Sequence, residues 1–277
     1  MVSRRLKEKI KQLVPTQLVR IYHALRLTFV ALYFKYCAIV YRGNTYFCPF
    51  CGQGFSRFLP DGEKSEAIAR HGVIGGGYRT NCLCPNCRSK DRERMLLLFL
   101  QQKTQLFDTS LKSLLHIAPE KNLKKLFRQM PQLRYINADL NPGAADVQMD
   151  ITAIPHPDSS FDYLLCNHVL EHIPNDAQAM RELFRVLKPG GTAILQVPFA
   201  EKLTNTYENF DITHPAEREF HFGQFDHVRI YGHDYPHRLE QAGFNVFVTT
   251  ALEALGSDSV QKLSLIPDEK IFIGTKL

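Results

Sequence analysis

The sequence contains no apolar run long enough to cross a bilayer. Its most apolar stretch, residues 27–41, is interrupted by Lys35 and is shorter than the ~20 residues that a membrane-spanning helix requires. The chain also lacks the succession of short basic region, apolar core and small-residue cleavage site that marks a secretory signal. These two absences predict a cytoplasmic protein without a transmembrane span.

Acidic residues are scarce near the N-terminus, where Glu8 stands alone against nine lysine and arginine residues in the first 45 positions. This arm carries a formal charge of +8 and the whole chain +6, so residues 46–277 sum to −2. The positive charge of the chain therefore says nothing about the substrate of the main domain. Only the N-terminal arm is a candidate for binding phosphate-rich partners or an anionic membrane surface.

Apolar residues recur at helical spacing within residues 1–45 and predict an amphipathic helix. We expect this helix to pack on the rest of the chain. The alternative is a peripheral contact with the cytoplasmic face of an anionic bilayer. The stripe consists of Leu18, Ile21, Leu25, Phe29, Leu32 and Tyr36.

Four of the seven cysteines form two C-x-x-C pairs, which in a chain without an export signal favours metal over disulfides. Four thiolates satisfy tetrahedral zinc and leave no coordination position open, so we expect a structural site. A redox function is less well supported, because neither pair opens a helix of a thioredoxin-like βαβ unit. Cys82 could replace one ligand, but we expect it to be a bystander. The predicted ligands are Cys48, Cys51, Cys84 and Cys87.

From residue 111 onward, short apolar runs alternate with helical patterns, which predicts βαβ units and a parallel sheet. Asn175 or Asp176 can cap one of the helices, and residues 189–191, Pro-Gly-Gly, end it. The expected strands are residues 114–117, 133–138, 161–166, 193–197, 245–249 and 270–275, and the expected helices include residues 122–129 and 235–242.

Three motifs in this region occur in a fixed order. They are D-x-x-x-x-P with D-S-S-F-D over residues 150–162, L-E-H-I at 170–173, and R-V-L-K-P-G-G at 185–191. With them, residues 111–277 resemble the class I S-adenosylmethionine (SAM)-dependent methyltransferases of the type 11-like branch. The cysteine pairs ahead of residue 114 are similar to those of a zinc-containing subgroup. The resemblance implies a doubly wound, Rossmann-like sheet of seven mostly parallel strands, with the last strand antiparallel.

The resemblance also implies a set of cofactor-binding residues. Asp139 would hold the ribose hydroxyls, Asp150 and Ile151 would lie along the adenine, and Asn167 would face the methionine end. Alternatively, Asp139 only ends a strand and Asp150 only caps a turn. The family's glycine-rich first loop is replaced by residues 116–121, H-I-A-P-E-K. Here Ala118 is still small and Glu120 could bind the cofactor's amino group; His116, Ala118 and Glu120 complete the expected set.

The motif H-x-x-E-H at His168, Glu171 and His172 follows a predicted buried strand and precedes Pro174, so it does not fit the helix of a zinc peptidase. Three interpretations remain open. The residues lie at the mouth of the cofactor cleft, where a histidine acts as base; they bind a second divalent ion, zinc, manganese or iron rather than magnesium; or they only stabilise a turn.

A second polar cluster, residues 217–231, corresponds in the resembled family to an acceptor-side lid. His227 is our first choice for a catalytic or acceptor-orienting residue, and His221 is the second. The alternative is a structural network of Asp226, His227 and Arg229 that ties the lid to the sheet.

These observations predict three regions: a basic helical arm at 1–45, a zinc-ribbon-like module at 46–95, and a methyltransferase domain at 96–277 with its lid at about 200–231. We expect methyl transfer to an oxygen or nitrogen of a small molecule, saccharide or lipid-linked intermediate. Nucleic acid is not an expected partner, since the cysteine pairs carry no repeated basic and aromatic stripe. The alternative is a non-catalytic module that docks on a membrane assembly or nucleic acid.

Overall fold

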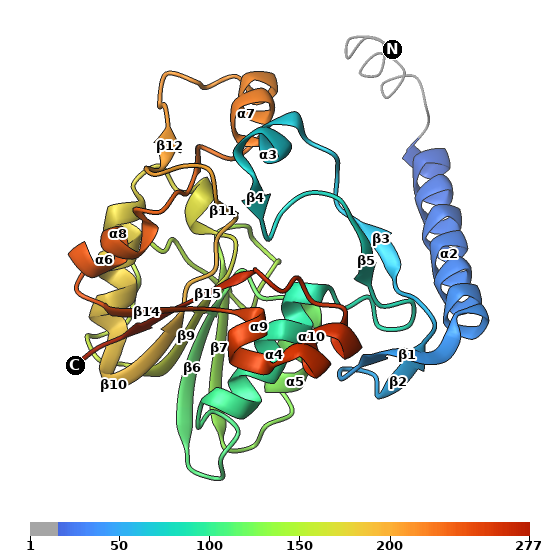
Figure 1. The fold of residues 1–277 in the computed structure, drawn as a ribbon, viewed down its shortest axis with the longest axis horizontal. Helices are drawn as coiled ribbons and strands as arrows, with labels where there is room; N and C mark the ends of the chain where they lie inside the picture. The colour runs from blue at the N-terminus through green and yellow to red at the C-terminus, as the bar shows by residue number, and fades with distance from the viewer. Residues whose placement is uncertain (1–15) are drawn as a thin grey trace.

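The computed structural model describes residues 16–277, and its centre is a sheet of seven strands in the order β14-β15-β10-β9-β6-β7-β8 (Figure 1). Strands β6 to β10 run parallel to one another, whereas β15 is antiparallel to both of its neighbours, β10 and β14. The predicted seven-stranded, mostly parallel sheet is confirmed. Its strands are β6 (Lys112–Ile117), β7 (Leu133–Asp139), β8 (Val147–Gln148), β9 (Phe161–Cys166), β10 (Leu187–Ile194), β14 (Asn245–Thr250) and β15 (Lys270–Thr275).

Two strands differ from the sequence prediction: β8 was not expected, and β10 has different bounds. The helix α6 (Asp176–Val186), capped by Asn175, ends before Pro189, and β10 begins at Leu187 instead of residue 193. The register with β9 breaks between Leu187 and Thr192. The strand therefore begins at Leu187, is interrupted by the Pro-Gly-Gly turn and resumes at Thr192. The apolar run in the sequence marks only the part after the turn.

Helices cover both faces of the sheet because successive strand residues point to opposite sides. Leu115 packs with α6 and α8 (Tyr235–Gln241), whereas Leu114 packs on the opposite side. In Figure 1 that second layer lies to the right of the sheet, and α6 and α8 lie to its left. It consists of α4 (Asp91–Lys103), α5 (Lys121–Phe127), α9 (Ala251–Leu255) and α10 (Ser257–Leu263).

The cysteine module packs directly against the domain that contains the seven-stranded sheet. The buried guanidinium of Arg94 donates to the carbonyl oxygens of Leu263 in α10 at 2.9 Å and of Cys82 in the module at 2.9 Å. Residue 95, where the sequence analysis ends the module, lies inside α4. The elements of the module are β1 (Arg42–Cys48), β2 (Gln53–Phe55), β3 (Leu59–Asp61), α3 (Glu66–His71), β4 (Val73–Ile74) and β5 (Arg79–Leu83).

The module also reaches the segment that follows β10, beyond the carboxyl ends of the strands. β4 pairs antiparallel with β11 (Phe199–Ala200), which follows β10 in the chain. Figure 1 shows α3 and β4 beside α7 (Pro215–Phe222), remote from the cysteine hairpin of β1 and β2. One stretch of the module is thereby built into the region above the carboxyl ends of the strands.

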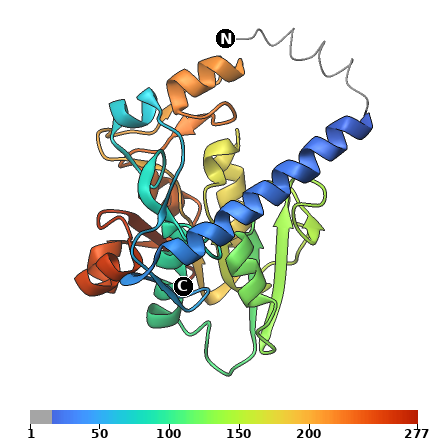
Figure 2. The same cartoon turned by 90° about the vertical axis from the view of Figure 1, so that its right-hand side faces the viewer.

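The expected N-terminal helix is present as α2 (Thr16–Val40), but it does not pack on the domain as we expected. It projects from the module as a single rod (Figure 2), with Leu25 66% and Phe29 73% exposed. Side-chain positions of Leu18 and Ile21, and all of residues 1–15, lie outside the described part of the chain. Among the described residues, no helix is long and apolar enough to cross a membrane.

Candidate active site

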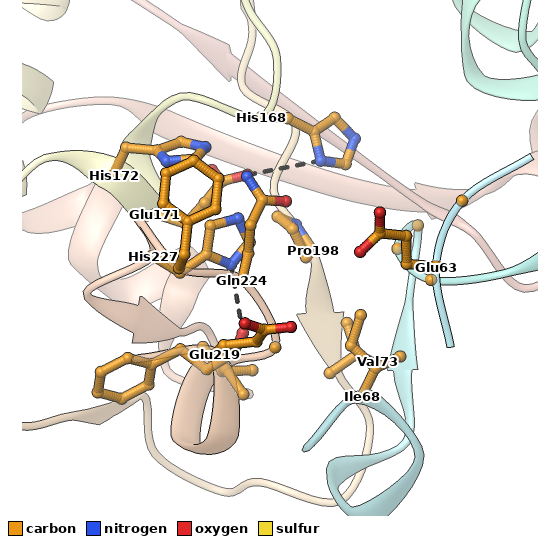
Figure 3. Close-up of a pocket in the computed structure, with 18 of the residues that line it drawn as sticks. Glu63, Ile68, Val73, His168, Glu171, His172, Pro198, Glu219, Gln224 and His227 are labelled. Atoms are coloured by element: carbon orange, nitrogen blue, oxygen red, sulfur yellow. Dashed lines mark hydrogen bonds and ion pairs between the residues drawn. The ribbon is translucent and has the colours of Figure 1, made fainter. Parts of the chain in front are cut away.

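A cavity of 540 Å³ opens where the module, the strand ends and the lid meet. Residues of the module form one wall, the segment after β9 forms the floor, and the lid forms the opposite wall (Figure 3). The lid contains β12 (Tyr207–Glu208), α7 and β13 (Arg229–Ile230). Charged lining residues come from all three parts: Asp61, Glu63, Arg79, Lys90, Arg92, Glu171, Glu219 and Arg229.

The floor carries the H-x-x-E-H motif. After β9 ends, His168 adopts a left-handed backbone (φ 54°), and the 3₁₀ turn η1 (Leu170–His172) follows. The motif is therefore not on a regular helix, as its context predicted. Glu171 is only 1% exposed, and its Oε2 has no hydrogen-bond partner among the described residues. Burial raises the pKa of Glu171 to about 8.

The lid brings His227 to this floor. The rings of His172 and His227 meet edge to face with 4.6 Å between their centroids. His172 Nδ1 lies 3.4 Å from a carboxylate oxygen of Asp226, and His227 Nδ1 lies 3.3 Å from the carbonyl oxygen of Phe222. Burial lowers the pKa of both histidines, that of His227 to about 4. Both imidazoles are neutral at neutral pH and can accept a proton or a metal ion.

His168 faces the same cavity from the strand end (Figure 3). Its Nδ1 lies 3.6 Å from Glu171 Oε1. Burial, followed by the positive charges of Arg92 and Arg79, holds the pKa of His168 well below its ordinary value of 6.5. A neutral histidine therefore stands between the strand ends and the cavity.

Two expectations about the lid need correction. His221 does not reach the cavity lining, as far as the described residues define it, and instead its Nδ1 lies 2.7 Å from the hydroxyl of Tyr207. Arg229 makes no network with His227. Its buried guanidinium donates to Glu208 Oε2 at 2.8 Å and to the carbonyl oxygens of Leu170, Ile173 and Pro174. Arg229 thus fastens the lid to the turn that carries Glu171.

The expected cofactor residues gather at the carboxyl ends of three adjacent strands. Ala138 of β7, Ile117 of β6 and Cys166 of β9 form one register row. The next residue on each strand is Asp139, Ala118 or Asn167. Ala118 has a φ of 47°, in the left-handed region that favours glycine. Residues 116–121 contain no glycine, but the backbone of Ala118 has a conformation of the kind that glycine normally supplies.

Glu120 links this edge together. Its carboxylate accepts hydrogen bonds from His116 Nε2 at 2.7 Å and Asn167 Nδ2 at 3.1 Å. Although burial acts to raise it, the hydrogen bond with His116 holds the pKa of Glu120 below its ordinary value. The Asn167 Oδ1 atom is buried without a partner within the described residues.

The side chains of Asp150, Ile151 and Asp139 differ in exposure. Asp150 Oδ1 accepts from the backbone N–H and the hydroxyl of Thr152, both at 2.8 Å, so this carboxylate does cap a turn. Ile151 is buried in the core. Asp139 Oδ1 accepts from the backbone N–H of Asn141 at 2.7 Å and is half-buried.

The four predicted zinc ligands come together. Their sulfur atoms all lie within 4.8 Å of one another, with 3.4 Å between Cys48 and Cys87 and 3.8 Å between Cys51 and Cys84. Such a compact group of four sulfurs suits tetrahedral zinc. Cys82 is turned away, with its Sγ 3.2 Å from Asp91 Oδ1, as expected of a bystander.

The sequence analysis missed the contribution of the module to the cavity. Glu63, Arg79 and Arg92 line it from one side, and Glu269 is buried beside Gly75 at the same wall. No local motif surrounds these residues. The only hint in the sequence is the group of glycines at 72, 75, 76 and 77.

Part of the sheet domain matches a known protein family. Residues 108–195 match the family model described as a methyltransferase domain. The ubiquinone/menaquinone biosynthesis C-methyltransferase UbiE of Salmonella arizonae is 34% identical over 67 residues, which cover 23% of this chain and 27% of that protein. An uncharacterized 37.1 kDa protein in transposon TN4556 of Streptomyces fradiae is 34% identical over 79 residues, 28% of this chain and 23% of that protein. The chain thus spans about a quarter of the length of these curated relatives.

Solved structures with a related arrangement include a SAM-dependent methyltransferase from Archaeoglobus fulgidus, at 13% identity and a TM-score of 0.43, covering 68% of this chain and 95% of that one. Phosphoethanolamine N-methyltransferase 2 of Haemonchus contortus, in complex with SAM, has 14% identity and a TM-score of 0.43, covering 66% and 52%. The family match and the sequence relatives support a methyltransferase domain at residues 108–195.

Proposed function

We propose that this protein transfers a methyl group from SAM to an acceptor held in the cavity between module, floor and lid. The observation that carries the proposal is the alignment of Ala118, Asp139 and Asn167 at the carboxyl ends of three adjacent parallel strands. Ligands of open α/β sheets bind at this edge. When bound, SAM supplies an electrophilic methyl group, which a lone pair of the acceptor takes as the carbon–sulfur bond breaks toward sulfur.

The residues at the strand edge fit the polar parts of this cofactor. The half-buried carboxylate of Asp139 would accept hydrogen bonds from the ribose hydroxyls. Asn167 Oδ1, which is buried and lacks a partner among residues 16–277, would accept one from the amino group beside Glu120. Asp150 and Ile151 would border the adenine.

The cavity supplies the acceptor side. Its volume of 540 Å³ and its lining by charges of both signs suit a polar small molecule, a saccharide or the head of a lipid-linked intermediate. His168 and His227 are neutral because burial lowers the pKa of each, so either can take the acceptor's proton. We expect an oxygen or nitrogen acceptor; the Salmonella relative is named a C-methyltransferase, and product analysis distinguishes the acceptor atoms.

Calorimetric titration of two aspartate variants with SAM tests the proposal. Asp139→Ala should weaken binding by about 10- to 100-fold, the cost of losing hydrogen bonds to a charged group. Asp258→Ala, an exposed position in α10, is the matched control and should bind as wild type does. Equal affinity in the two variants would show that Asp139 does not hold the ribose. No binding by any folded protein would favour the non-catalytic docking module instead.

We also propose that α2 lies on an anionic bilayer surface. Its large apolar side chains are exposed together with Arg26 and Lys35, the combination that binds such surfaces. The chain should sediment with vesicles that contain phosphatidylserine, and less so with neutral vesicles or after deletion of residues 1–40. Equal recovery with all vesicles would contradict this role.

A further inference from the structure

We propose that Glu171, His172 and His227 hold one divalent cation at the floor of the acceptor cavity. One oxygen of Glu171 and one nitrogen from each histidine lie within 4.8 Å of one another. All three residues line the cavity (Figure 3). One of the three interpretations left open by the sequence had His168 as the third ligand, whereas the structure groups His227 of the lid with Glu171 and His172. The cation site stands independently of methyl transfer; only its role toward the acceptor rests on the proposed function.

The surroundings of the two histidines are those of metal ligands. A ligating histidine commonly uses its second ring nitrogen to contact a carbonyl or carboxylate, which fixes the ring. His227 Nδ1 contacts the carbonyl oxygen of Phe222 at 3.3 Å, which leaves Nε2 for the cation. His172 Nδ1 lies 3.4 Å from Asp226, which can orient that ring in the same way.

The carboxylate of Glu171 points to a missing partner. Its Oε2 is buried at the cavity floor and contacts no donor within the described chain. Native proteins rarely leave such an oxygen unsatisfied. Arg229 donates to the carbonyl oxygens of Leu170 and Ile173 on either side of Glu171, which fixes the backbone of the turn that carries this carboxylate. A cation would satisfy the oxygen where it stands.

The donor set indicates which cations fit. Two imidazole nitrogens and one carboxylate oxygen favour zinc, manganese, iron or cobalt over magnesium or calcium. Three protein ligands leave coordination positions open, in contrast to the closed four-cysteine site. Those positions face the cavity, where an oxygen-bearing acceptor can bind the cation. His227 is then a ligand, and His168 remains as the nitrogen that accepts the acceptor's proton.

Cation titrations of the full-length chain, with one zinc already bound per chain at the cysteines, test the site. Mn²⁺ is followed by electron paramagnetic resonance, and a further equivalent of Zn²⁺ by calorimetry. Wild type should bind one added ion per chain. Glu171→Gln keeps the shape but cannot ionise to an anionic ligand, so it should fold, as circular dichroism will show, and bind at least tenfold more weakly. His227→Ala should do the same.

The matched control is His221→Ala, the same change six residues earlier in the lid but outside the cavity lining, which should bind as wild type does. The site is overturned if wild type binds neither added Mn²⁺ nor added Zn²⁺, or if Glu171→Gln binds the cation as tightly as wild type does. SAM titration of the same samples without added metal separates the two proposals. SAM binding without a cation leaves the proposed function standing, and cation binding without SAM leaves the cation site standing.

Discussion

The imidazole rings of His172 and His227 meet edge to face at 4.6 Å and an interplanar angle of 84°. One comes from the turn after β9 and the other from the lid, and both flank the buried carboxylate of Glu171. The contact places the lid directly over the strand ends. The chemistry that we assign to the cavity therefore depends on how firmly the lid is held.

Arg229 is the residue that holds it, so Arg229→Ala should be strongly destabilising. The change removes the 2.8 Å partner of Glu208 and one donor from each of three carbonyl oxygens of the floor. Breaking a buried ion pair costs about 3–5 kcal/mol of unfolding free energy. Urea denaturation measures this loss. Arg128→Ala, which removes an exposed pair with Asp146, should leave the midpoint nearly unchanged; equal midpoints for both variants would contradict the assignment.

The four-cysteine site should be separable from the nearby thiol. Cys84→Ser removes one of the clustered sulfurs, so the chain should lose its zinc and melt at a lower temperature. Cys82→Ser, two residues away, should keep one zinc per chain because its sulfur contacts Asp91 instead. Atomic emission spectroscopy counts the zinc. The ligand set is wrong if the Cys84 variant retains its zinc or the Cys82 variant loses it.

Ala118 should tolerate glycine but not valine. At a φ of 47°, a β-branched side chain costs about 1–2 kcal/mol more than glycine and fills the space at the strand edge. Ala118→Gly should therefore bind SAM as wild type does, whereas Ala118→Val should lose at least tenfold in affinity and unfold at lower urea. Equal SAM affinity for the two variants would mean that the cofactor does not approach this loop.

Glu269 should make stability fall as pH rises. Burial raises its pKa in the folded protein from the ordinary 4.5 to about 7. Between these values the folded state binds more protons than the unfolded state, so stability decreases from about pH 4.5 to about pH 7 and the loss persists above. Glu269→Gln lacks this dependence. We therefore expect the urea midpoint of Glu269→Gln to rise relative to that of wild type from pH 5.5 through 7.0 to 8.5. A difference between the two midpoints that does not change with pH would contradict the raised pKa of Glu269.

The sheet could be predicted because its strands are coded locally. Each is a short apolar run bounded by polar residues, and the motifs at 150–191 fix their order. There are two exceptions. β8 is an exposed strand of two residues that the sequence did not predict, and the start of β10 before Pro189 depends on pairing with β9 and is not marked by an apolar run. The exposure of α2 could not be predicted either, because its apolar spacing is the same whether it packs on the domain or stands free.

The cavity was only half predictable. Asn167, His168 and Glu171 follow a strand directly, so their place at its end is a local matter. That Glu63 and Arg79 face them depends on the antiparallel pairing of β4 with β11, which joins segments more than 120 residues apart and has no sequence signature beyond a few glycines. His227 and His221 are equally polar in sequence, and only the fold of the lid distinguishes them.

SAM binding by the wild-type chain tests the central claim most directly. Calorimetric titration of folded protein, with one zinc bound per chain, should give one site per chain, and S-adenosylhomocysteine should displace SAM from it. That result would show that residues 116–121 bind the cofactor without the usual glycines. No binding of either compound by protein whose fold and zinc content are verified would contradict the account.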